Sequence, residues 1–89
     1  MTVLVKITAT GLDQSAYDHM VPGVHPLLKQ QAGFIIHVAY PIPGGFAVNE
    51  VWESQAQHDA WYKEFVVPNL PDPNAMSTEY IELHAILQR

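Results

Sequence analysis

Two apolar, β-branched runs in the middle of the chain are separated by a short segment rich in proline and glycine. Residues 33–40 read GFIIHVAY and residues 46–53 read FAVNEVWE, with PIPGG between them. Proline and glycine favour turns, whereas β-branched and aromatic residues favour strands. The pattern predicts an antiparallel hairpin over residues 33–53, and every other segment of the fold has to be arranged around it.

The flanking segments each contribute one strand and one helix. Residues 2–9 (TVLVKITA) and 79–87 (EYIELHAIL) predict the first and the last strand of the chain. Asp13 is a candidate N-cap for a helical pattern that ends before Gly33. That pattern is carried by Tyr17, Met20, Val21, Val24, Leu27 and Leu28. Pro22 and Pro26 interrupt it, so we expect two short helices or one kinked helix.

A second helix follows the hairpin. Ser54 and Gln57 have the spacing of a capping box, which predicts a helix over residues 55–67 that Pro68 ends. Its predicted apolar side is Ala60, Trp61, Phe65 and Val66. Residues 71–73 (Pro-Asp-Pro) predict an irregular connection to the last strand. The order is β-α-β-β-α-β, so we expect one ferredoxin-like α+β domain over residues 1–89, with both helices on one face of an antiparallel sheet.

Alternation along the strands sorts their side chains into two faces. The set expected under the helices is Val3, Val5, Ile7, Phe34, Ile36, Val38, Tyr40, Phe46, Val48, Glu50, Trp52, Ile81, Leu83, Ala85 and Leu87. The opposite set is Leu4, Lys6, Thr8, Ile35, His37, Ala39, Ala47, Asn49, Val51, Tyr80, Glu82, His84 and Ile86. The opposite set is mixed but too apolar to face water comfortably. Two helices cover only one side, so a symmetric homodimer is the simplest way to bury the other.

Charge and composition narrow the class of partner. The chain has nine acidic residues and four basic ones, for a net charge of −5. The bases are scattered, and nucleic-acid binding needs them clustered, so we expect no nucleic acid and no anionic membrane as partner. The N-terminus lacks the features of a signal peptide, no apolar run approaches the roughly 20 residues of a membrane span, and there is no cysteine. We therefore expect a cytoplasmic protein that binds a neutral, mostly apolar small molecule.

Several short motifs are similar to those of one known family. Gly33-Phe34 opens the second strand, and Val51-Trp52-Glu53-Ser54 ends the third. His-Pro-Leu-Leu at 25–28 and Val-Pro-Asn-Leu at 67–70 lie in the two helical regions. With the element order, these features make the chain resemble the antibiotic biosynthesis monooxygenase family over nearly its whole length.

The resemblance implies a dimeric α+β barrel with a pocket in each subunit, between the sheet and its helices. Relatives in this family oxygenate polycyclic aromatic phenols to quinones with O₂ and no bound metal or flavin, and others open the haem ring. The wider superfamily includes polyketide cyclases and isomerases. Trp52 stands where a tryptophan at the end of a strand matters in several relatives. Several also use an asparagine early in the chain, and this sequence has none before Asn49.

Glu50 and Trp52 are the first candidates for catalysis. Both are expected on the face under the helices, where an unpaired carboxylate is costly. In a dry pocket, Glu50 would be a base for a phenol proton. The alternatives are that Glu50 pairs with a helix residue such as His25, or that it lies at a wet edge. Trp52 can orient a ring or simply pack the core.

His25 is the third catalytic candidate, as a base near neutral pH, or it is a partly exposed helix residue. The aromatic residues Tyr17, Trp61, Tyr62 and Phe34 are candidate substrate-binding residues, because aromatic walls stack on planar ligands. Core packing is the competing explanation for them. Resemblance and residues together predict no cofactor and no metal.

A polar cluster of Lys6, His37, Asn49, Glu82 and His84 is expected on the opposite face. A metal site from His37, Glu82 and His84 is conceivable, but separate strands and the lack of a spacing motif favour a hydrogen-bonded cluster. His19 and His58 are expected at the surface. The function predicted is cofactor-independent oxygenation of a planar phenol, with a polyketide cyclase or a non-catalytic ligand-binding dimer as alternatives.

Overall fold

The computed structural model describes residues 1–70 and 72–89. Along the chain lie β1 (Val3–Thr10), α1 (Gln14–Leu28), β2 (Phe34–Ile42), β3 (Gly45–Trp52), α2 (Gln55–Trp61) and β4 (Met76–Glu82). Shorter helical turns at Tyr62–Val66, Val67–Asn69 and Pro73–Ala75 connect α2 to β4. The predicted β-α-β-β-α-β order is confirmed. Of the predicted 71–73 connection, Pro71 lies outside the described residues.

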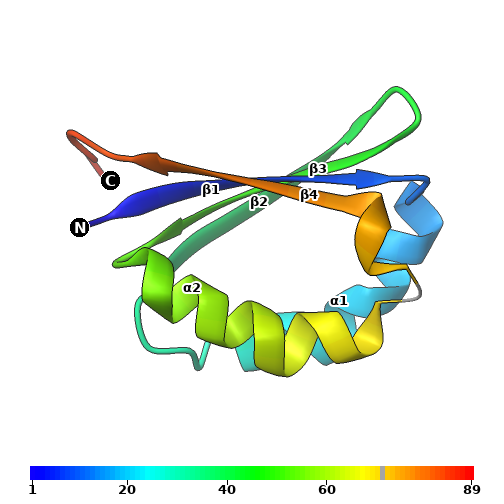
Figure 1. The fold of residues 1–89 in the computed structure, drawn as a ribbon, viewed down its shortest axis with the longest axis horizontal. Coiled ribbons are helices and arrows are strands. Elements are labelled where there is room, and N and C mark those ends of the chain that lie inside the picture. The colour runs from blue at the N-terminus through cyan, green and yellow to red at the C-terminus, as the bar shows by residue number, and fades with distance from the viewer. Residues whose placement is uncertain (71) are drawn as a thin grey trace.

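The four strands form one antiparallel sheet in the order β2-β3-β1-β4. Both helices lie on the same side of it, as Figure 1 shows. This is the ferredoxin-like α+β arrangement that the element order predicts. We call the side under the helices the covered face and the other side the open face. In the described part of the chain, no helix is long and apolar enough to cross a membrane.

Helix α1 begins as its sequence predicts. The backbone N–H of Ala16 donates to Asp13 Oδ1 at 2.8 Å, so Asp13 is the N-cap. Pro22 and Pro26 lie inside one 15-residue helix rather than dividing it into two. Each proline removes one backbone donor, yet the helix continues through both, with Val24 and Leu28 packed in or against the core. The helix ends at Leu28, before Gly33.

Helix α2 also begins at its predicted cap, where Gln57 N–H donates to Ser54 Oγ at 3.2 Å. Beyond Trp61 the helix widens into a π-helical turn over Tyr62–Val66. The predicted surface position of His58 is wrong, because this side chain is 1% exposed. His58 lies three residues before Trp61 and seven before Phe65, so all three share one side of the helix.

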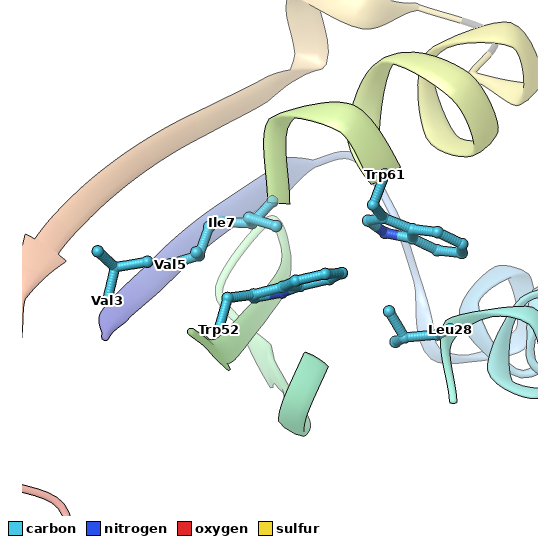
Figure 2. Close-up of a cluster of buried hydrophobic side chains, with 6 residues drawn as sticks. All are labelled: Val3, Val5, Ile7, Leu28, Trp52 and Trp61. Atoms are coloured by element: carbon cyan, nitrogen blue, oxygen red, sulfur yellow. The ribbon is translucent and has the colours of Figure 1, made fainter. Parts of the chain in front are cut away.

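The apolar core joins the centre of the sheet to both helices. Val3, Val5 and Ile7 of β1 pack with Trp52, Leu28 and Trp61, and all six are buried. Figure 2 shows this cluster, with the two tryptophans reaching the core from β3 and α2. Trp52 and Val5 are 0% exposed. The covered face is therefore closed by packing at the end of the sheet where Trp52 lies.

The predicted faces are right for β1 and β3 but wrong for most of β2. An irregularity between Phe34 and Ile36 inserts one extra residue, so that Phe34 pairs with Trp52 but His37 pairs with Glu50. A one-residue bulge exchanges the two faces of the strand beyond it. His37 and Ala39 consequently lie on the covered face. The residues moved to the open face are Ile36, Val38 and Tyr40, exposed by 44%, 47% and 46%.

Strand β4 differs from its prediction in both position and face. It covers Met76–Glu82 rather than 79–87, and Tyr80 pairs with the buried Val5. Tyr80 therefore lies on the covered face and Ile81, 38% exposed, on the open one. The predicted alternation placed the more apolar isoleucine under the helices. The tyrosine takes that place because its hydroxyl finds hydrogen-bond partners on α2.

Candidate functional site

A cavity of about 890 Å³ lies between the covered face of the sheet and the two helices. Most of its wall is apolar, which suits a largely apolar ligand. The polar and aromatic side chains that line it include Tyr17, His19, His25, His37, Glu50, His58, Trp61 and Tyr62. A volume of this size is in the range of pockets that hold drug-sized ligands.

Glu50 lies at the centre of the polar wall. Its side chain is 4% exposed, and it faces a donor at each oxygen. His37 Nδ1 lies 2.6 Å from Oε2, and Trp52 Nε1 donates to Oε1 at 2.9 Å. A carboxylate only accepts, so His37 carries a proton on Nδ1, and in the neutral imidazole Nε2 then presents a lone pair. The alternative that Glu50 pairs with a helix residue such as His25 is wrong as to partner, because the bulge in β2 brings His37 there instead.

The Tyr17 hydroxyl links His37 to a second histidine, His25. Its hydroxyl lies 2.7 Å from His37 Nε2 and 3.2 Å from His25 Nε2. Because His37 Nε2 has no proton, the Tyr17 hydroxyl donates to it and its oxygen accepts from His25. The four side chains form a one-way chain from His25 through Tyr17 and His37 to Glu50. Nδ1 of His25 makes no hydrogen bond within the described residues.

The protonation states fit this direction. Burial, then the charges of Glu50 and Asp18, raise the pKa of Tyr17 above its ordinary value, so its hydroxyl keeps its proton. Burial and the neighbouring His37 lower the pKa of His25, against an opposing effect of Glu50. His25 is therefore neutral near pH 7 and can accept a proton.

A second histidine approaches Glu50 from α2. His58 Nδ1 lies 2.9 Å from the Tyr80 hydroxyl, and that hydroxyl donates to Asp59 Oδ1 at 2.5 Å. His58 Nε2 lies 3.8 Å from Glu50 Oε1. Burial lowers the pKa of His58, although Glu50 and Asp59 oppose the change. The pKa of Tyr80 is raised, first by burial and then by its hydrogen bond to Asp59.

The structure divides the predicted site residues into two groups. Those on the cavity wall are Tyr17, His25, Glu50, Trp61 and Tyr62. Trp52 and Phe34 do not line the cavity; they pack edge to face, with ring centroids 5.6 Å apart, at the end of the sheet. Trp52 meets the site only through its N–H bond to Glu50. A direct contact with substrate is not available to either residue in this arrangement.

Sequence reasoning missed His37 and His58. For His58 a signal existed, because it falls on the helix side that carries Trp61 and Phe65. For His37 there was none, because nothing in the sequence marks the bulge.

The predicted polar cluster does not form. His37 is on the covered face, whereas Asn49 on the open face donates to Tyr40 at 3.3 Å. Among the described residues, no group of three or more histidines and carboxylates is placed to hold a metal ion.

No protein-family model and no curated protein matches the sequence. Solved structures do match. A heme-degrading protein from Mycobacterium tuberculosis is 18% identical, with a TM-score of 0.66 over 99% of this chain and 98% of that one. SnoaB, a cofactor-independent oxygenase from Streptomyces nogalater, is 13% identical, with a TM-score of 0.58 over 98% and 94%. A mutant form of SnoaB is 9% identical, with a TM-score of 0.61 over 99% and 97%.

These similarities cover whole chains and define the class of fold. The protein has the ferredoxin-like α+β fold of these solved structures, which is the fold that the resemblance to the antibiotic biosynthesis monooxygenase family implied. At such low identities the likeness extends to the fold alone, and the chemistry has to be argued from this chain's own residues.

Proposed function

We propose that the protein is a cofactor-independent monooxygenase that acts on a planar aromatic, polyketide-like phenol with O₂. The observation that carries this proposal is the hydrogen-bonded chain from His25 to Glu50 on the wall of a mostly apolar cavity. Oxygenation without a cofactor needs an electron-rich phenolate, so the protein's main task is to remove a proton. The shared fold of SnoaB, a cofactor-independent oxygenase, supports the assignment.

The hydrogen-bonded side chains from His25 to Glu50 offer a route for the phenol proton. His25 Nδ1 accepts the phenol proton, while its Nε2 proton passes to Tyr17 and the Tyr17 proton passes to His37 Nε2. The positive charge ends on His37, directly beside the Glu50 carboxylate, which stabilises it. Glu50 and His25, each a candidate base from the sequence, are then the two ends of one relay.

The oxidation balances with O₂ as the only co-reactant. The phenolate gives electrons to O₂, and a carbon–oxygen bond forms to give a peroxide. Loss of the second hydrogen from that carbon and cleavage of the O–O bond leave a carbonyl group and release one water. An anthrone consumes one O₂ and yields one quinone and one water, with no hydrogen peroxide.

The remaining site residues have supporting roles in this proposal. Tyr17, Trp61 and Tyr62 provide aromatic surface for a planar substrate. Trp52 is a positioning residue, because its N–H holds Glu50 in place. Phe34 supports Trp52 from the side, without substrate contact.

Oxygen uptake with an anthrone tests the proposal. Quinone should form with one O₂ consumed per molecule. Glu50→Gln and His25→Gln should each lower kcat/KM by about 10² to 10⁴, the usual contribution of a general base. Glu79→Gln, a matched change on an exposed residue of β4, should leave the rate unchanged. If Glu50→Gln and His25→Gln turned over as fast as the control Glu79→Gln, the relay would have no part in the mechanism.

A polyketide cyclase is the second candidate, because the same relay could remove a proton next to a carbonyl. It would convert a poly-β-ketone without consuming oxygen, so oxygen uptake separates the two. A non-catalytic ligand-binding dimer would bind an anthrone without turnover. Haem, which the M. tuberculosis protein degrades, belongs in the same binding comparison.

We further propose a homodimer formed through the open face. Its support is the row of exposed apolar side chains at Ile36, Val38, Tyr40 and Ile81. An exposed apolar patch marks an interface in a protein of this size. Two copies of the chain that packed together through their open faces would form the dimeric barrel that the resemblance implies. The single domain over residues 1–89 and the cytoplasmic location both stay predictions.

A further inference from the structure

The least satisfied group in the cavity wall is Nε2 of His58. The side chain is 1% exposed, and Nε2 has no hydrogen-bond partner among the described residues. Buried polar atoms are nearly always paired in native proteins, because leaving one unpaired is costly. His58 is among the residues that line the cavity, although Nε2 itself is covered when the cavity is empty, so a ligand donor would have to enter between the side chains around it.

The tautomer of His58 follows from its other nitrogen. Tyr80 has one hydroxyl proton, and it is donated to Asp59. The Tyr80 oxygen can then only accept from His58, which puts the imidazole proton on Nδ1. In the neutral ring, Nε2 is consequently a bare acceptor. Its nearest charged neighbour is another acceptor, Glu50 Oε1, 3.8 Å away.

Two acceptors side by side select the kind of group that can enter. A hydroxyl or N–H donor is favoured, because it satisfies Nε2 and is attracted by the carboxylate. A carbonyl or ether oxygen placed there would bring a third lone pair toward the same point and satisfy nothing. Oε1 already accepts from Trp52, so one ligand donor is enough to complete the wall.

We propose that His58 Nε2 accepts a hydrogen bond from a second hydroxyl of the substrate, so that the ligand is an aromatic dihydroxy compound. This inference rests on the proposed function for the first hydroxyl, which faces His25. Tyr80 and Asp59 act through His58 as positioning residues, because they hold the tautomer that makes Nε2 an acceptor.

Binding measured without oxygen tests this claim apart from turnover. Calorimetry compares 1,8-dihydroxyanthrone and naphthalenediols with their mono-methyl ethers, which keep the shape but lose one donor. The wild type should bind the better diol at least about tenfold more tightly than its ether, since a buried hydrogen bond is gained and an unpaired acceptor is removed. His58→Phe, which fits between Trp52 and Tyr80, should bind both with equal affinity.

Tyr80→Phe separates this role from simple packing. It leaves the shape nearly intact but frees the imidazole to move its proton to Nε2, where it would donate to Glu50. The preference for the diol should then fall, although the substrate never touches Tyr80. His84→Phe, on an exposed residue, is the control and should retain the wild-type preference.

Each outcome decides the question. The inference fails if His58→Phe keeps the wild-type preference for the diol. It also fails if the wild type shows no preference, which is the result expected if a water molecule alone satisfies Nε2. Binding of neither ligand also overturns it. In the free protein, ¹⁵N NMR should find the His58 proton on Nδ1, and a proton on Nε2 would contradict the claim. Quinone formation without a diol preference would leave the proposed function standing and sink only this inference.

Discussion

The two faces of the sheet reverse the usual distribution of polarity. On the covered face, under the helices, Glu50 and His58 are 4% and 1% exposed. On the open face, Val38 and Tyr40 are 47% and 46% exposed. Burying ionisable groups while exposing apolar ones lowers the stability of a monomer. Each face therefore supports one of the two proposals: the covered face supports the proposed site, and the open face supports the proposed interface.

The largest expected effect contrasts a buried tryptophan with an exposed tyrosine. Trp52→Ala should lower the free energy of unfolding by about 3–5 kcal/mol, because it empties the core and strips Glu50 of a donor. Tyr40→Ala should cost less than about 1 kcal/mol in a dilute monomer. Urea unfolding measures both. Comparable losses would mean that the two faces are equally packed, which would break the comparison.

Local sequence signals predicted the parts of the fold that depend on neighbouring residues. The caps at Asp13 and Ser54, the hairpin, and the alternation in β1 and β3 are all set within a few positions along the chain. Even the turn behaves as expected, since Gly44 has φ of 76°, a conformation in which glycine is favoured. The order of elements then leaves few ways to build the sheet.

The site could be predicted only in part, because its geometry depends on one inserted residue and one register. The bulge near Ile35 places His37 beside Glu50, and the pairing of Tyr80 with Val5 places the hydroxyl against His58. Neither choice leaves a trace in hydrophobic alternation, which even favours the other register for β4. Sequence reasoning found Glu50, His25 and Tyr17 separately, but not the histidine that connects them.

A charge on the open face tests what that face does. Val38→Lys should weaken self-association at least about a hundredfold, because a lysine would be buried against a second apolar surface. Ala60→Lys, at an exposed position of α2, is the matched control and should leave the dimer intact. Sedimentation equilibrium measures both. A wild type that is monomeric at high concentration would refute the proposed interface, and an unaffected Val38→Lys dimer would place the interface elsewhere.

The smallest predicted effect is a loss of folding stability in acid, which we attribute to His58 on the covered face. The pKa of His58 is lowered in the folded state, mainly by burial, with Glu50, Asp59, Tyr62 and Tyr80 around the ring. The unfolded chain therefore binds the proton first, below its ordinary pKa of about 6.5. Between that value and the lower folded pKa, the free energy of unfolding falls as the pH falls. His58 contributes at most about 1.4 kcal/mol per pH unit to this slope.

Urea unfolding across this pH range measures the slope. The stability of His58→Phe should be less sensitive to acid than that of the wild type. Above about pH 7.5 the free energies of unfolding of the two proteins should change with pH in parallel, because His58 is neutral in both the folded and the unfolded state. His84→Phe controls for the loss of one imidazole from an exposed position. If His58→Phe retained the full slope while His84→Phe lost it, the acid sensitivity would lie outside the covered face. If His58→Phe alone lost the acid sensitivity of the wild type, the buried imidazole of His58 would be its source.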